Sequence, residues 1–181
     1  MGITIQLLEI NTPVEKFSCG NADLDDFLKT DALSNMDDWV SVTKVIFVDK
    51  VLAGYFTITP DTIHKGRVEH SDKVAEYPYQ KYPAVKLARL AVDEQFQHRG
   101  IGTELMADFF KTARKVVKSA GGRYITVDAK NTACAFYERF GFRKVLSQKD
   151  SDIVSMYLDF KKFYQLSKSL LDGAENKSCR L

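Results

Sequence analysis

The residues best suited to chemistry lie in a short turn near the middle of the chain, with the sequence QHRGIG at Gln97–Gly102. The turn follows a β-rich run and precedes a helical pattern, so the unpaired backbone N–H groups of the first helical turn point toward one spot. Together with the partial positive charge of the helix N-terminus, they form a site for an anion such as a pyrophosphate. Gly100 and Gly102 let a ligand approach the backbone closely, and Arg99 and Thr103 add side-chain donors.

Three phosphate-binding patterns compete for this turn. The Walker pattern requires Gly-Lys-Ser/Thr, which the chain lacks, and the dinucleotide pattern requires a third glycine where Leu105 stands. The third pattern is Gln/Arg-x-x-Gly-x-Gly/Ala, which Gln97, Gly100 and Gly102 match at every defined position. The turn therefore resembles the acetyl-CoA loop of the GNAT N-acetyltransferases.

The surrounding sequence strengthens this resemblance. Leu90-Ala91-Val92 precedes the turn, as in the strand before the loop of many family members. Further along, Val127-Asp128-Ala129, the stretch 131–137 and the pair Gly141-Phe142 are similar to the second cofactor-binding half of the family. The resemblance extends over residues 7–160. Asn131 stands six residues before Tyr137, one closer than in many members, so a helix cap is the alternative to a CoA role for Asn131.

The resemblance implies a cosubstrate, acetyl-CoA, and a set of residues that bind it: Leu90, Ala91, Val92, Gln97, His98, Arg99, Gly100, Ile101, Gly102, Thr103, Asn131 and Phe136. It also implies that Tyr137 is the catalytic general acid, since a phenol with pKa near 10 is protonated at pH 7 and can protonate a departing thiolate. The alternative for Tyr137 is a core tyrosine on the apolar helix face that it shares with Ala133 and Phe140.

A narrower resemblance extends along most of the chain. The chain is similar to the GNAT subgroup that includes toxins of toxin–antitoxin pairs in Phe17-Ser18-Cys19-Gly20, Leu24-Asp25, Phe27-Leu28, Gly54-Tyr55-Phe56, Arg89–Asp93, Val127-Asp128-Ala129 and Phe136-Tyr137. Known toxins of that subgroup acetylate the amino group of aminoacyl-tRNA and are silenced by a small DNA-binding antitoxin. The resemblance therefore implies aminoacyl-tRNA as an acceptor, a small antitoxin as a partner and a homodimer, which is common in the family.

The acceptor and the general base stay open. The alternatives to aminoacyl-tRNA are a small-molecule or protein amine, and a CoA-binding interaction module without turnover. Asp93, Glu94, Asp128 and Glu138 are candidate bases by proximity in sequence. An α-amine, with pKa roughly 7.7 to 8.0, is partly neutral without a base, whereas a lysine amine near 10.4 needs help, so the lack of an obvious base favours an α-amine.

The remaining chemically capable residues have structural interpretations. Three cysteines at wide spacing and three scattered histidines form no CxxC or Cys/His cluster, so we expect no metal site and no disulfide framework. Cys134 is expected to pack rather than to act as a nucleophile. We expect Trp39 to be a core or groove aromatic, and Arg89 to face substrate or to form an exposed salt bridge.

Composition and periodicity predict one mixed α/β domain over residues 1–165 and a helical tail over 166–181. The expected strands are 3–10, 42–48, 52–59, 84–92, 124–129, 142–146 and 155–160, with an extended loop over 60–83 and a turn over 148–152. A helix capped by Asn21 and helices over 102–120 and 133–140 complete the pattern. The resemblance implies the GNAT fold, a mostly antiparallel twisted sheet of six to seven strands flanked by about four helices.

The net charge of +2 conceals an uneven distribution. Residues 1–40 contain two basic and eight acidic residues, whereas residues 41–160 contain 19 basic and 14 acidic residues. The basic part suits an anionic cosubstrate and permits an RNA acceptor. The N-terminus lacks the features of a secretory signal and no apolar run is long enough to span a membrane, so a cytoplasmic location is expected.

Overall fold

The computed structural model describes residues 2–147 and 151–178. Most of the turn expected over 148–152 lies outside these residues. The chain divides into two compact units: the first contains residues 1–60 and 85–120, and the second contains 61–84 and 121–181. Within the described residues, none of the helices combines the length and apolar character needed to cross a membrane.

The described residues form one sheet of seven strands in the order β1-β2-β3-β4-β5-β7-β6. β1 pairs antiparallel with β2, β2 with β3, β5 with β7, and β6 with β7. This order and the structural neighbours described below confirm the predicted mixed α/β fold. The strands are β1 (Ile3–Leu7), β2 (Val42–Val48), β3 (Val51–His64), β4 (Lys81–Val92), β5 (Tyr124–Lys130), β6 (Arg143–Lys144) and β7 (Ile153–Asp159).

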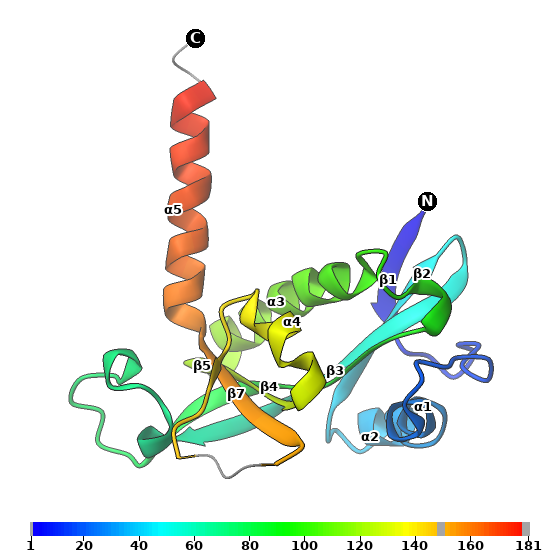
Figure 1. Cartoon of the computed structure of the whole chain (residues 1–181), viewed down its shortest axis with the longest axis horizontal. Helices are drawn as coiled ribbons and strands as arrows, with labels where there is room; N and C mark the ends of the chain where they lie inside the picture. Colours follow the sequence, from blue (N-terminus) through cyan, green and yellow to red (C-terminus); the bar gives the residue numbers. More distant parts are fainter. Residues whose placement is uncertain (1, 148–150, 179–181) are drawn as a thin grey trace. The chain divides into compact units, whose positions relative to one another are not determined.

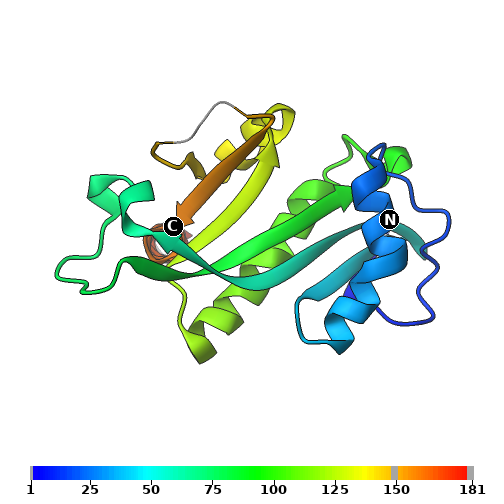
Figure 2. The same ribbon diagram turned by 90° about the horizontal axis from the view of Figure 1, so that it is seen from below.

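The first unit packs helices on both faces of its strands. α3 (Ile101–Ala120) covers one face, and a helical segment over residues 22–37 covers the other (Figures 1 and 2). That segment consists of α1 (Ala22–Asp26), a π-helical turn η1 (Phe27–Asp31) and α2 (Ala32–Asp37). Its apolar side chains share a core with Phe17, Val45 and Tyr55. α3 buries the face that its periodicity predicted, through Leu105, Phe109, Ala113 and neighbouring residues.

Among its described residues, the second unit contains the paired strands β5, β7 and β6 and four short helical turns. These are η2 (Lys65–Arg67), η3 (His70–Asp72), η5 (Asn131–Ala133) and α4 (Cys134–Glu138). The longer α5 (Phe160–Ser178) continues directly from β7 and projects away from these strands (Figure 1). Tyrosines dominate its core, where Tyr82, Tyr124 and Tyr157 lie in ring contact with one another or with Tyr77.

The structure corrects two details of the predicted elements. β3 continues past Pro60 to His64 and β4 begins at Lys81, so the expected loop over 60–83 is shorter than predicted. Pro60 and Pro83 lie within strands, although proline usually marks a strand end because it lacks the N–H of the ladder. Asn21 occupies the N-cap position of α1, but its side chain makes no capping hydrogen bond.

Candidate functional site

The turn before α3 has the backbone conformation of an open anion site. His98 and Gly100 both have positive φ, +59° and +85°, which reverses the chain between η4 (Glu94–Phe96) and Ile101. Gly100 O accepts N–H bonds from Thr103 and Glu104, so it is the N–H groups of Ile101 and Gly102, ahead of the first bonded N–H, that have no acceptor within the helix. A Cβ at Gly100 would meet no atom within 4 Å, so open space adjoins this glycine. A ligand could therefore reach the backbone here.

The predicted cofactor residues in this turn differ in their side-chain environment. The side chains of His98, Arg99 and Thr103 are exposed, whereas Ile101 is buried beneath the start of α3. The Gln97 amide does not extend freely into solvent, because its Nε2 donates hydrogen bonds to the carbonyls of Cys19 (3.1 Å) and Val92 (3.0 Å). Gln97 thus ties the end of β4 to the segment before α1.

Asp93 anchors the start of the same turn. It is only 5% exposed, and its two carboxylate oxygens accept N–H bonds from Gln95 (3.0 Å) and Ser18 (3.1 Å). Its own N–H donates to Ala53 O at 2.9 Å. Both carboxylate oxygens therefore have a structural use, which argues against the sequence-based suggestion of Asp93 as a general base.

Close backbone packing sets the position of the helix that carries the turn. A Cβ at Gly54 in β3 would lie 2.7 Å from Ala91 O and 3.0 Å from Leu105 Cδ1. Only glycine therefore lets β3, the end of β4 and the first turns of α3 approach this closely. The Gly54-Tyr55-Phe56 sequence thus contributes a spatial requirement that periodicity alone did not reveal.

Arg89 makes a contact that the sequence did not suggest. Its guanidinium lies 3.7 Å from the ring centroid of Phe27, a buried residue of η1. Phe27 stacks on Tyr55, and the Tyr55 hydroxyl donates a 2.7 Å hydrogen bond to Leu24 O. Neither expectation for Arg89, substrate contact or an exposed salt bridge, included this cation–π contact, which fixes the helical segment against β4.

Tyr137 lies in α4 of the second unit. It is 7% exposed, and its ring contacts those of Phe136 and Phe142 at centroid distances of 5.2 and 5.7 Å. Burial, reinforced by Cys134, raises the pKa of Tyr137 to about 12. The phenol is therefore protonated throughout the physiological pH range. This environment suits a proton donor, and it also suits the core tyrosine that was the alternative.

The other predicted residues of this unit have varied surroundings. Asn131 is exposed in η5 and its N–H donates to Asp152 O, while the N-cap position of α4 belongs to Ala133, so Asn131 does not cap that helix. Phe136 is half-buried between aromatic neighbours. Cys134 is buried, as expected of a packing residue, and lies 3.7 Å from Lys130 O. The described residues contain no cluster of three or more His, Cys, Asp or Glu side chains suited to a metal ion.

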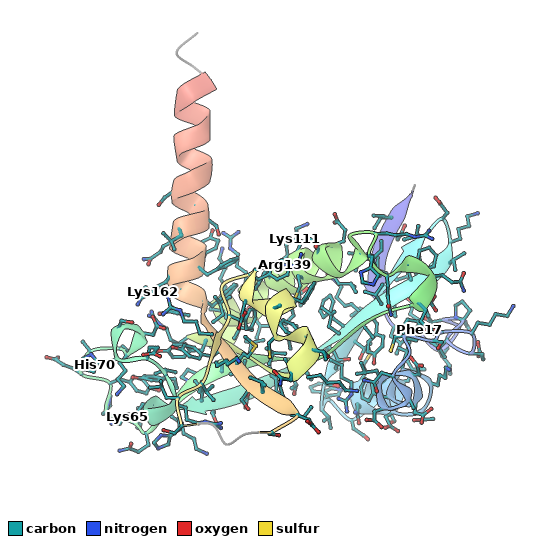
Figure 3. The ribbon with its side chains drawn as sticks, in the orientation of Figure 1. Phe17, Lys65, His70, Lys111, Arg139 and Lys162 are labelled. Atoms are coloured by element: carbon teal, nitrogen blue, oxygen red, sulfur yellow. The ribbon has the colours of Figure 1, made fainter. Side chains whose placement is uncertain are left out.

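Sequence reasoning missed a buried carboxylate, Asp72 in η3. It accepts hydrogen bonds from Tyr157 Oη and Lys162 Nζ, both at 2.8 Å, and from Arg143 at 3.3 Å. Figure 3 labels Lys162 at the base of α5 and His70 in η3. No local pattern could have revealed Asp72, because its partners come from 71 to 90 residues away in sequence.

The chain is similar to members of a known protein family. The family model described as "Acetyltransferase (GNAT) domain" matches residues 27–158, which include the turn, β4, α3 and α4. A tRNA-acetylating toxin of Mycobacterium tuberculosis (strain ATCC 25618 / H37Rv) is 34% identical over 133 residues, covering 71% of this chain and 77% of that protein.

Solved structures give the same fold. A tyrosine-to-phenylalanine mutant of KacT superimposes with a TM-score of 0.81 at 27% identity, over 92% of this chain and 99% of that chain. AtaT complexed with acetyl-methionyl-tRNAfMet has a TM-score of 0.80 at 22% identity, over 91% of this chain and 99% of that chain. At that identity, the second likeness concerns the fold alone.

Proposed function

Because the chain belongs to the GNAT acetyltransferase family, we propose that it binds acetyl-CoA at residues 97–103 and acetylates the α-amine of aminoacyl-tRNA. The main support for acetyl-CoA binding is the conformation of this turn. The turn exposes residues 98–100 and open space adjoins Gly100, while the N-terminus of α3 offers a pyrophosphate the N–H groups of Ile101 and Gly102 and a favourable dipole. Leu90, Ala91, Val92, Asn131 and Phe136 complete the proposed binding set.

The proposed chemistry is direct transfer. The neutral amine nitrogen attacks the thioester carbonyl carbon, the carbon–sulfur bond breaks, and the departing thiolate takes a proton. We assign that proton to the Tyr137 phenol, which burial keeps protonated at neutral pH. The amine nitrogen releases one proton to solvent when it forms the amide, and the Tyr137 phenolate takes one proton back from solvent.

Aminoacyl-tRNA is favoured as acceptor by the relatives. One is named a tRNA-acetylating toxin, and AtaT was solved with acetyl-methionyl-tRNAfMet. The excess of basic residues after residue 40 suits an RNA ligand. Such an acceptor implies action in the cytoplasm.

The relatives also suggest regulation by an antitoxin. AtaT is described bound to the C-terminus of the antitoxin AtaR and to acetyl-CoA, and KacTA is described in complex with DNA. We therefore propose that a small antitoxin silences this chain. We also propose that the chain forms a homodimer. Residues 1–165 form a single GNAT domain in this proposal, and a tail follows it.

The experiment is an acetyl-CoA turnover assay with charged tRNA, polyamines and peptides offered in parallel. We expect turnover with charged tRNA, and a drop of roughly 10²-fold or more in kcat for Tyr137→Phe with unchanged thermal stability. Tyr79→Phe, at an exposed tyrosine, is the matched control and should keep full activity. Equal rates in Tyr137→Phe and wild type would remove Tyr137 as the acid. Turnover with polyamines or peptides alone would favour the alternative acceptors.

The pH profile separates the acceptor classes independently. For an α-amine, kcat/KM should rise with pH and level off near the α-amine pKa of roughly 7.7 to 8.0. A lysine acceptor without a base should show the rise continuing toward pH 10. Tyr137 stays protonated over both ranges, because its pKa is about 12.

A further inference from the structure

We infer that the Phe17–Gly20 segment is a positioning element that fixes the acetyl-CoA turn in its binding conformation. This inference rests on the proposed cofactor site and goes beyond it, because residues 17–20 lie outside both the turn and the matched family model, which begins at residue 27. Figure 3 labels Phe17, the first residue of this segment. None of its residues needs to touch the ligand for the role that we assign.

Four long-range hydrogen bonds join the segment to the turn, the longest of them from Ser18 Oγ to Glu94 Oε2 at 3.5 Å. Ser18 N donates to Asp93 Oδ2 at 3.1 Å, and Glu94 N donates to Ser18 O at 2.9 Å. One residue further along, Cys19 O accepts from Gln97 Nε2 at 3.1 Å. Ser18 and Cys19, which are consecutive, therefore hold both ends of the stretch 93–97.

The segment itself is fixed on its other side. The Phe17 ring is buried and packs edge-on against Tyr55 at a centroid distance of 5.6 Å. Cys19 N donates a 2.8 Å hydrogen bond to Asp25 Oδ1 in α1, and Asp25 is itself only 9% exposed. The Asp25 carboxylate in α1 therefore holds the segment from its other side.

Gly20 shows how close the two pieces of chain lie. Its φ is +79°, and a Cβ at this position would lie 3.0 Å from Glu94 Oε1. The fixed turn presents its N–H groups before any ligand arrives, so binding does not have to order them. Loss of the two hydrogen bonds that Gln97 Nε2 donates to the carbonyls of Cys19 and Val92 should therefore weaken acetyl-CoA binding.

The test uses substitutions at Gln97 and a matched control. Gln97→Met keeps the length of the side chain but removes both donors, and Gln97→Arg restores N–H groups that can donate to the two carbonyls. Gln95→Met makes the same chemical change on an exposed side chain two residues earlier. The acetyl-CoA dissociation constant is measured by calorimetry for each full-length protein, together with its melting temperature.

We expect Gln97→Met to raise the dissociation constant about tenfold, as loss of two hydrogen bonds predicts, and Gln97→Arg to restore most of the affinity. Gln95→Met should bind like wild type. Equal affinity in Gln97→Met and Gln95→Met would overturn the positioning role while leaving the cofactor proposal intact. Absence of binding to wild type would overturn the cofactor proposal and this inference together. If Gln97→Met unfolds, Asp93→Asn replaces it, with the expectation of a weaker loss in the same direction.

Discussion

Two buried aspartates hold two loops of this protein in different ways. Asp93 holds the turn before α3 by accepting two backbone N–H groups, from Ser18 and Gln95. Asp72 holds the segment between β3 and β4 by accepting side-chain donors, from Tyr157, Lys162 and Arg143. The first arrangement uses none of the side chains of residues 98–103, whereas the second uses the side chains of Tyr157, Lys162 and Arg143.

Because the two aspartates use different kinds of partner, we expect them to affect different properties, ligand affinity and stability. The groups that donate to Asp93 are backbone N–H groups, which add no charge near the anion that the turn is proposed to bind. The Asp93 carboxylate is the charged group of this arrangement. The Asp72 cluster instead joins η3, β6, β7 and α5 through side chains, two of them cationic. We therefore expect changes at Asp72 to affect the unfolding free energy, and changes around Asp93 to affect acetyl-CoA affinity.

The largest expected effect on stability comes from Asp72→Ala. The Tyr157 hydroxyl, in a fully buried residue, would lose an acceptor, and the free energy of unfolding should fall by roughly 2 to 3 kcal/mol. Lys162 and Arg143 add little to this figure because both are substantially exposed. Urea unfolding gives the stability, and the acetyl-CoA dissociation constant should stay close to that of wild type. A large change in that constant with unchanged stability would break the comparison.

The same carboxylate predicts a pH dependence. Burial acts to raise the pKa of Asp72, but hydrogen bonds and charges from Lys162, Tyr157 and Arg143 outweigh it and hold the pKa below its ordinary value. A lowered folded-state pKa contributes stability that is present above the unfolded pKa of about 3.9 and is lost as pH falls through the folded value. Unfolding free energies measured from pH 7 to pH 3 should therefore fall less steeply at the acidic end in Asp72→Asn than in wild type.

Gly54→Ala tests a purely steric requirement in the first unit. The added methyl group would collide with the Ala91 carbonyl, a backbone atom that cannot move alone, so we expect a loss of roughly 1 to 2 kcal/mol. Acetyl-CoA affinity should also fall, because β4 and α3 carry the two ends of the turn. Gly2→Ala makes the same chemical change where the added methyl group would meet only Asp49 Oδ1, at an ordinary contact distance of 3.6 Å, and is the matched control. A Gly54→Ala protein as stable as wild type would contradict the close-packing account.

The smallest predicted effect is on a thiol. Burial, with the hydrogen bond and charge of Asp25, raises the pKa of Cys19 to about 12. Asp25→Asn removes the charge, so the pKa should fall and alkylation of Cys19 by iodoacetamide at pH 8.5 should accelerate several-fold. Peptide mass spectrometry separates Cys19 from Cys134 and Cys179. An unchanged alkylation rate would show that Asp25 does not control this thiol.

The sequence predicted what depends on local pattern. The period of α3, the glycines of its preceding turn and the β-rich runs were sufficient for the mixed α/β fold, which the structure confirms. The family and its acetyltransferase activity followed from spaced motifs, and the comparisons confirm both. The roles of Gln97 as a donor to two carbonyls and of Arg89 over Phe27 could not be predicted, because they depend on contacts between distant segments. The site residues, including Tyr137, stay predictions.

The central claim is that the chain acetylates the α-amine of aminoacyl-tRNA, and mass spectrometry of the product tests it most directly. Charged tRNA is incubated with the protein and acetyl-CoA, then digested so that the terminal aminoacyl-adenosine can be weighed. The account predicts one added acetyl group on the amino acid nitrogen, dependent on acetyl-CoA and greatly reduced in Tyr137→Phe. An unmodified aminoacyl-adenosine, under conditions where the same preparation acetylates a polyamine or a peptide, would contradict it.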